Sequence, residues 1–201
     1  GLKPNVVVGS FLNWLDDEGE SVKTNFVGGD SDLFIVEACE YKRSFLNLNP
    51  NILIITNLEA DHLDYYKDLQ DVQQAFYDLA KKLPEDGKII CRADGSNLKN
   101  IVLDFADKIV DYSEIVEKVP EMKVFGDHNK ENAAAAISAI QSYLYLQKSD
   151  IEIESEEVID AVKNFKGTWR RMEYKGSLVN KEGGLGAKVY DDYGHHPTET
   201  K

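Results

Sequence analysis

Residues 51–66, NILIITNLEADHLDYY, join a short apolar run to a cluster of polar groups, and this stretch constrains the fold more than any other. The run 52–55 is continuous and rich in β-branched residues, which is typical of a strand buried on both faces of a parallel sheet. Ligands of open α/β sheets bind beyond the carboxyl ends of strands. The groups that follow that end here are Glu59, Asp61, His62 and Asp64. We expect a metal or proton-handling site there, although a solvated loop with one incidental histidine would explain a lone His-Asp pair.

Predicted strands and helices alternate along the rest of the chain. We expect strands over 5–9, 32–39, 88–91 and 108–112, a short hairpin around 22–27, and helices over 69–83, 97–106, from 126 onward and over 155–165. Such alternation implies crossover connections, and therefore an α/β fold with a mainly parallel sheet flanked by helices. We expect strands 32–39 and 52–57 to be parallel neighbours, which would bring Glu37 and His62 to the same end of the sheet.

From residue 172 the pattern changes to the period of two that is typical of strands. Two such strands, 172–179 and 187–193, flank a glycine-rich segment, which a hairpin turn explains better than a phosphate-binding loop. We therefore place a domain boundary near 167–171. The predicted domains are 1–168, a partial central domain, and 169–201, the first strands of a second α/β domain.

Charge and cysteine content restrict the function. The formal net charge of -13 disfavours nucleic acid and anionic membrane surfaces as partners, because no basic stretch offsets the repulsion. Cys39 and Cys91 lie in or beside apolar strands, so we expect reduced thiols and a cytoplasmic protein. No apolar run approaches the ~20 residues of a membrane span. The chain begins GLKP without methionine and without a signal peptide, from which we expect an excised segment.

Two sets of residues could serve a nucleotide and a metal. Glu37, Glu40 and His62 offer carboxylate oxygens and one imidazole, which suit magnesium or manganese better than structural zinc. His128, Asn129 and Asn132 lie at a helix start, where amides suit a base edge or a phosphate. The alternatives are a strand-end ion pair for Glu37 and ordinary helix capping for Asn129.

Two further sets lie near the end of the chain. Arg170 and Arg171 could neutralise phosphoryl charge, because guanidinium presents a planar fork of donors, although a solvated basic turn is the alternative. The segment 191–197, DDYGHHP, follows an apolar strand and could bind ribose hydroxyls, an amine or a metal. Alone, its histidine pair would also fit a zinc site or an expression tag, but ordered sequence on both sides argues against a tag.

Five segments in this order resemble the Mur ligase family, the ATP-dependent enzymes that form amide bonds in peptidoglycan assembly. The segments are EACE (37–40) with RSF (43–45), TNLEADHLD (56–64), GDHN (126–129) with NAA (132–134), FKGTWRR (165–171) and DDYGHHP (191–197). Together they cover nearly the whole chain. The last segment particularly resembles the alanine-adding branch or its relative that recycles murein tripeptide.

The resemblance implies a Rossmann-like central ATPase domain, ATP and Mg²⁺ as cofactors, and UDP-N-acetylmuramate and L-alanine as substrates. It also implies roles for individual residues. Glu37 and His62 would hold magnesium, with His62 counted among the catalytic residues. His128, Asn129 and Asn132 would contact the nucleotide, Arg170 or Arg171 the γ-phosphate, Asp191 or Asp192 the ribose, and Tyr193, His195 and His196 the incoming amino acid. The lactyl carboxylate would attack the γ-phosphorus, and the amine would displace phosphate from the acyl phosphate.

The sequence departs from the family in two respects. Cys39 stands where the family usually has aspartate, and the glycine-rich phosphate loop expected upstream of 5–9 is not in these 201 residues. We therefore expect a fragment that is inert alone and binds ATP–magnesium weakly or not at all. The alternatives are a tripeptide-recycling or folylpolyglutamate-type ligase, a noncatalytic nucleotide-binding module, and a metallohydrolase that uses His62, His195 and His196.

Overall fold

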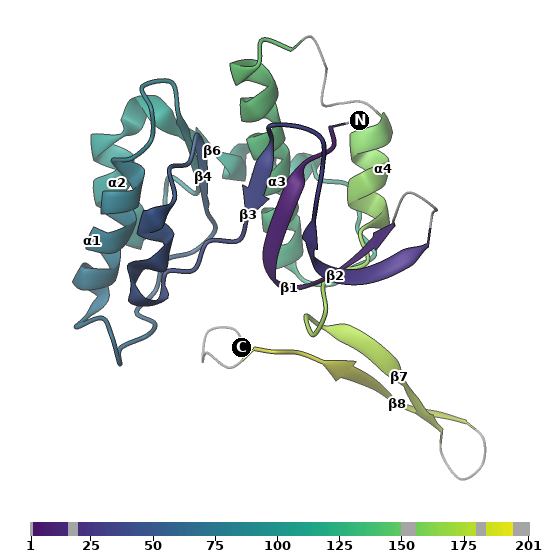
Figure 1. Ribbon diagram of the computed structural model, residues 1–201. Coiled ribbons are helices and arrows are strands. Elements are labelled where there is room, and N and C mark those ends of the chain that lie inside the picture. Colours follow the sequence, from purple (N-terminus) through teal and green to yellow (C-terminus); the bar gives the residue numbers. More distant parts are fainter. Residues whose placement is uncertain (1, 16–19, 150–155, 180–183, 195–201) are drawn as a thin grey trace. The chain divides into compact units, whose positions relative to one another are not determined.

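The computed structural model describes residues 2–15, 20–149, 156–179 and 184–194. The chain forms two compact units, Gly1–Glu37 with Lys166–Lys201 and Ala38–Phe165 (Figure 1). Each unit is described by itself below. No helix of the described residues is long and apolar enough to cross a membrane.

The unit Ala38–Phe165 is built on a parallel three-stranded sheet in the order β4-β5-β6. The strands are β4 (Ile52–Ile55), β5 (Lys88–Cys91) and β6 (Ile109–Asp111). Their register aligns Ile55 with Cys91 and Cys91 with Asp111, so the carboxyl ends of all three strands lie level. The helices are α1 (Leu69–Ala80), α2 (Lys99–Asp104), α3 (Asp127–Leu146) and α4 (Glu156–Asn164). Short 3₁₀ segments lie between these strands and helices along the chain: η1 (Tyr41–Asn47), η2 (Ser96–Leu98), η3 (Ala106–Lys108) and η4 (Tyr112–Lys118).

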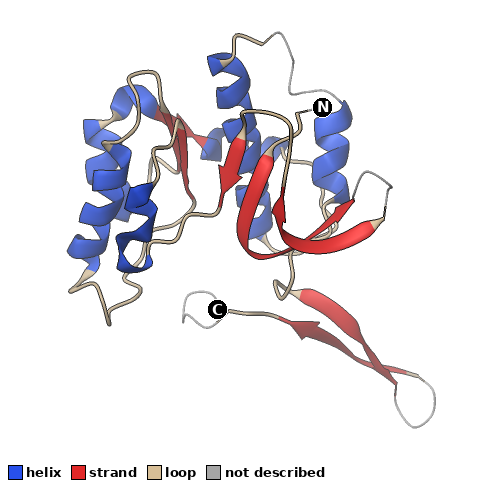
Figure 2. Cartoon of the chain, in the orientation of Figure 1, coloured by secondary structure: helices blue, strands red, loops and turns tan. Residues whose placement is uncertain are grey.

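Alternate residues of the central strand β5 face opposite layers of helices. Ile89 and Cys91 pack with α1 and α2, whereas Ile90 packs with Ala133–Ala135 of α3. The helices accordingly lie on both faces of the sheet (Figure 2). The side chains of Ile89, Ile90 and Cys91 are fully buried, and each isoleucine contributes roughly 1.5–3 kcal/mol of transfer free energy. The run 52–55 was predicted to be buried on both faces, and this is wrong for β4: Ile54 is 44% exposed, because β4 is at the end of the strand order and the central strand is β5.

Helix ends follow local sequence signals. Asp68 is the N-cap of α1 and accepts a hydrogen bond from the Asp71 amide at 2.9 Å. Helix α3 begins after Gly126, whose φ of 98° lies in the region that glycine adopts without penalty. The predicted cap of α1 and the start of the longest helix at residue 126 are both confirmed.

The other unit contains two antiparallel hairpins. Strand β1 (Asn5–Leu15) pairs antiparallel with β2 (Ser21–Val27) and parallel with β3 (Phe34–Val36). Strand β7 (Glu173–Val179) pairs antiparallel with β8 (Leu185–Asp191), as the period-two pattern predicted. The predicted strand at residue 5 is longer than expected, and it supplies the edge against which β3 pairs.

The predicted pairing of strands 32–39 and 52–57 stays a prediction, because the two strands lie in different units. Strand β3 pairs with β1 within one unit, and β4 pairs with β5 within the other. The domain division at 168/169 stays a prediction.

Candidate functional site

The loop after β4 holds His62 in an uncommon backbone conformation. Its φ is 54°, in the left-handed region, and its amide donates to Asp61 Oδ1 at 2.6 Å. Its carbonyl accepts hydrogen bonds from the amides of Tyr65 and Tyr66, each at 2.9 Å. Non-glycine residues in this region are uncommon, and they persist where surrounding contacts over-determine them. The loop therefore fixes the direction in which the imidazole leaves the main chain.

Three potential ligands of a cation meet at His62. Its Nε2 lies 2.9 Å from Glu40 Oε1 and 3.9 Å from Asp61 Oδ2. One ligand atom from each of the three residues lies within 4.8 Å of the others. Two hard carboxylate oxygens with one imidazole fit magnesium or manganese. The structure thus brings together His62 and Glu40, and it adds Asp61, which the sequence analysis named after β4 without assigning it a role.

Tyrosines surround this group. The Tyr41 ring packs against the His62 ring with centroids 5.0 Å apart, and the Tyr41 hydroxyl donates to Asp64 Oδ2 at 3.1 Å. That hydrogen bond to a carboxylate raises the pKa of Tyr41. Burial is the main cause that raises the pKa of Tyr66, which is 1% exposed. Both phenols are therefore neutral hydrogen-bond donors at neutral pH.

Glu37 belongs to the other unit. It follows β3, and its Oε2 accepts a hydrogen bond from the Gly9 amide at 2.8 Å. Its own amide donates to the Val7 carbonyl at 2.8 Å. Because Glu37 and His62 lie in different units, the prediction that both hold one metal stays a prediction.

The start of α3 presents two of the three predicted nucleotide contacts to solvent. His128 and Asn132 are exposed, whereas Asn129 is half-buried and its Nδ2 donates to the Phe125 carbonyl at 2.6 Å. The amide of Asn129 also donates to the Gly126 carbonyl at 3.0 Å. Both hydrogen bonds of Asn129 are thus made within the start of α3, as in the helix-capping alternative.

The residues predicted at the chain's end contact one another. Arg170 Nε lies 3.4 Å from Asp191 Oδ1, and the Arg170 guanidinium lies 5.1 Å from the centre of the Tyr193 ring. Asp192 accepts hydrogen bonds from the amides of Met172 at 2.7 Å and Gly194 at 2.6 Å. The side chain of Arg171 is exposed. His195 and His196 lie outside the described residues.

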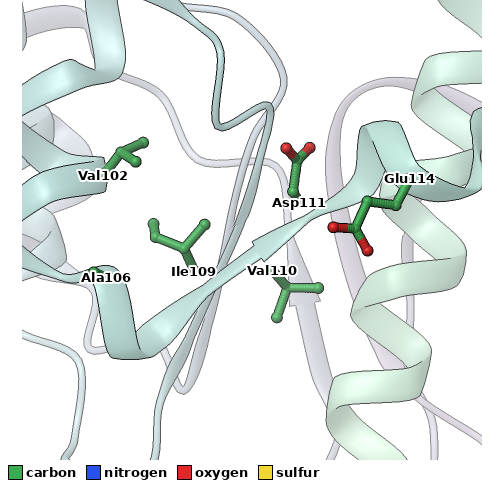
Figure 3. A pocket seen from close by; sticks show the side chains of 6 residues that line it. All are labelled: Val102, Ala106, Ile109, Val110, Asp111 and Glu114. Atoms are coloured by element: carbon green, nitrogen blue, oxygen red, sulfur yellow. The ribbon is translucent and has the colours of Figure 1, made fainter.

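A separate open concavity of about 430 Å³ lies at the sheet edge formed by β6 (Figure 3). Its lining residues are Val102, Ala106, Ile109, Val110, Asp111 and Glu114. Ile109 and Val110 point to opposite sides of the strand in Figure 3. Asp111 Oδ1 already accepts a hydrogen bond from the Ser113 amide at 2.9 Å. Among the described residues, no site residue that was predicted from the sequence lines this concavity.

Comparison with known proteins agrees with this architecture. Residues 20–118 match the family described as the Mur ligase middle domain. The chain belongs to the Mur ligase family and shares the fold of that family's middle domain.

Relatives of established name are similar over the whole chain. The chain is 35% identical to the UDP-N-acetylmuramate–L-alanine ligase of Clostridium kluyveri over 226 aligned positions, which cover 100% of this chain and 45% of that ligase. The ligase of the same name from Clostridium acetobutylicum is also 35% identical, with the same coverage. The chain thus spans a little under half the length of these relatives.

Two solved structures share the fold. One is the UDP-N-acetylmuramate:L-alanyl-γ-D-glutamyl-meso-diaminopimelate ligase from Neisseria meningitides, with a TM-score of 0.60 and 19% identity over 85% of this chain and 60% of that one. The other is a murein peptide ligase from Psychrobacter arcticus 273-4, with a TM-score of 0.59 and 23% identity over 98% of this chain and 47% of that one.

Proposed function

We propose that this chain supplies the metal-holding and nucleotide-contacting part of an ATP-dependent ligase that joins L-alanine to UDP-N-acetylmuramate. The observation that carries the proposal is the 35% identity, over the whole chain, to ligases named for that reaction. The proposal concerns a protein of full ligase length, because the chain covers 45% of those relatives. The reaction consumes ATP, so we expect it in the cytoplasm.

The side chains that meet at His62 fit a divalent cation. His62 offers an imidazole nitrogen, and Glu40 and Asp61 place carboxylate oxygens beside it. In the proposed site His62 and Glu37 hold Mg²⁺, which when bound offsets negative charge on the phosphates of ATP. His62 is held by main-chain hydrogen bonds, so its imidazole is oriented before any ligand arrives.

The side chains proposed to contact the nucleotide are either exposed to solvent or held by a weak ion pair that a ligand can replace. His128 and Asn132 are exposed in the first turns of α3, where the helix dipole favours a negatively charged ligand. The Arg170–Asp191 pair is about one-third exposed, and such pairs stabilise a fold by about 1 kcal/mol or less. In the proposal Arg170 or Arg171 turns to the γ-phosphate and Asp191 accepts from a ribose hydroxyl.

The proposed chemistry has two steps. A carboxylate oxygen of the sugar substrate attacks the γ-phosphorus, the bond from that phosphorus to ADP breaks, and an acyl phosphate forms. The amine nitrogen of alanine then attacks the acyl carbon, phosphate leaves, and the amine loses a proton. Tyr193, His195 and His196 are the residues proposed to receive the amino acid.

Ligation assays on a ligase of full family length that carries this chain test the proposal. The enzyme receives ATP, Mg²⁺ and UDP-N-acetylmuramate, with either L-alanine or the murein tripeptide as the amine. We expect product with L-alanine, and loss of product in His62→Ala with little change in stability. Lys99→Ala, an exposed position on α2, is the matched control and keeps wild-type turnover. Preference for the tripeptide would refute the alanine assignment, and full turnover by His62→Ala would refute the metal assignment.

A further inference from the structure

We infer that Glu40 is the positioning residue for His62. Its carboxylate accepts a hydrogen bond from Nε2–H of the imidazole. The other ring nitrogen, Nδ1, then has the lone pair that binds a divalent cation. The inference rests on the proposed function, because it concerns the same metal site. Of the three potential ligands, it makes Glu40 the group that orients His62 rather than a group that binds the cation.

The contact between the two side chains fixes the proton on one ring nitrogen. Glu40 Oε1 lies 2.9 Å from His62 Nε2, and both side chains are about one-third exposed. A carboxylate only accepts hydrogen bonds, and a neutral imidazole has one nitrogen that donates and one that accepts. In a neutral ring that donates to Glu40 the hydrogen lies on Nε2, and Nδ1 carries the electron pair. Metal-bound histidines commonly donate their second N–H to a carboxylate in this way.

The main chain keeps His62 in place for this contact. Its φ of 54° is maintained by the hydrogen bonds of its amide to Asp61 and of its carbonyl to Tyr65 and Tyr66. The Tyr41 ring packs beside the imidazole, with ring centroids 5.0 Å apart and an interplanar angle of 48°. Backbone strain of this kind clusters at functional sites.

Glu40 is anchored to the same buried tyrosine. The Tyr66 hydroxyl donates to the Glu40 carbonyl at 2.5 Å, and Tyr66 is 1% exposed. Three residues after Glu40, Arg43 donates to Asp71 Oδ1 at 2.5 Å and lies over the Tyr66 ring. Tyr66 therefore forms hydrogen bonds with the main chain of both residues, at the Glu40 carbonyl and at the His62 carbonyl, and positions them together.

A second arrangement would give the same separation. Two adjacent ligands of an octahedral Mg²⁺ at about 2.0–2.1 Å lie about 2.9 Å apart, so a cation between Glu40 and His62 would also fit the distance. The two arrangements differ in one observable. Positioning keeps hydrogen on Nε2 when metal binds, whereas shared ligation removes it.

Nitrogen-15 NMR of the histidines in this 201-residue chain distinguishes the arrangements. Spectra are recorded at a pH where the imidazole is neutral, with and without millimolar Mg²⁺, and His62 is assigned as the signal missing in His62→Asn. We expect a protected Nε2–H in both conditions, and a Mg²⁺-dependent shift at Nδ1. An Nδ1–H tautomer, or loss of the Nε2 hydrogen on adding Mg²⁺, would overturn the inference.

Substitutions of Glu40 show whether its carboxylate positions the His62 ring or only stabilises the fold. Glu40→Gln keeps an oxygen acceptor and should keep the Nε2–H signal, whereas Glu40→Ala should lose it to rapid exchange with water. Asp61→Asn is the matched control: it keeps Oδ1, which accepts from the His62 amide, and removes a charge 3.9 Å from Nε2. We expect it to leave the signal unchanged. A signal that persists in Glu40→Ala would overturn the inference, and wild-type spectra decide the tautomer even if that variant does not fold.

Metal dependence in a ligase of full family length gives a second readout. Glu40→Ala should raise the Mg²⁺ concentration for half-maximal activity about 10- to 100-fold, with turnover largely recovered at saturating Mg²⁺. Glu40→Gln should restore most of this shift. Equal metal dependence in all three proteins would contradict the inference. A Glu40-dependent Nε2–H that never responds to Mg²⁺ would support the hydrogen bond and would count against the proposed metal function.

Discussion

Arg92 connects the end of β5 to the start of α3 through Glu131, with 2.7 Å between Arg92 Nη1 and Glu131 Oε1. Its Nη2 also lies 3.0 Å from Asp94 Oδ2. The hydrogen bond from Arg92 is the main cause that lowers the pKa of Asp94. Glu131 precedes Asn132, so this ion pair holds the helix turn that carries a proposed nucleotide contact.

We predict that Arg92→Gln lowers the free energy of unfolding by about 1 kcal/mol or less, because the pair is about one-third exposed. The larger effect should be local: amide hydrogen exchange in the first two turns of α3 should accelerate while exchange in α1 is unchanged. Lys99→Gln is the control for loss of a charge elsewhere. Unchanged exchange in α3 would show that Arg92 does not hold the helix start.

Because Arg92 also pairs with Asp94, Glu131→Gln should lower stability by no more than Arg92→Gln does, and the double variant should be no less stable than Arg92→Gln alone. The Asp94 carboxyl has a lowered folded-state pKa, so its contribution is present above the unfolded-state pKa and is lost as pH falls through the folded one. Additive losses in the double variant, measured by urea unfolding, would contradict the coupling.

Cys91 should make the fold sensitive to alkaline pH. Burial raises the pKa of its thiol from 9.0 to about 11, and the side chain is fully buried. Because the folded-state pKa is the higher one, the stabilisation is fully present below about pH 9 and is lost as pH rises through about 11. The loss amounts to roughly 3 kcal/mol at most, since one pKa unit corresponds to about 1.4 kcal/mol.

The test compares urea unfolding of wild type and Cys91→Ala at about pH 8 and about pH 10.5. Cys91→Ala is less stable at the lower pH because it leaves a small cavity. The difference between the two proteins should shrink at the higher pH. A difference that stays constant would show that the thiol does not ionise on unfolding.

The capping contact of α1 provides a separate test of the fold. Asp68 accepts a hydrogen bond from the Asp71 amide at 2.9 Å. Asp68→Ala should cost about 1 kcal/mol, whereas Asp68→Ser keeps an oxygen acceptor and should cost much less. Thermal unfolding of the three proteins measures the difference. Equal midpoints for the alanine and serine variants would rule out a stabilising cap.

Features encoded by neighbouring residues were predictable from the sequence. The run 52–55 and the spacing in 69–83 predicted β4 and α1, and Asp68 predicted the cap. The partner of β3 was not predictable, because burial patterns do not specify pairing between distant strands. The sequence therefore placed most elements but not the sheet order.

The candidate site was predictable only as a collection of residue types. Strand ends indicated that Glu40 and His62 belong near a ligand, but their 2.9 Å contact depends on the left-handed φ at His62. No periodicity in the loop encodes that angle. Asn129 shows the opposite case, because its side-chain Nδ2 donates to the Phe125 carbonyl although its type and position fit a nucleotide contact.

The most direct test of the central claim, that His62 serves a metal-dependent ligase, is the ligation rate of His62→Gly. Glycine adopts a φ of 54° without penalty, so this variant should fold at least as well as His62→Ala. In a ligase of full family length that carries this chain, we predict kcat/KM for L-alanine addition at least ~100-fold below wild type, with the unfolding midpoint within a few degrees. Ligation by His62→Gly at the wild-type rate and the wild-type Mg²⁺ dependence would contradict the claim.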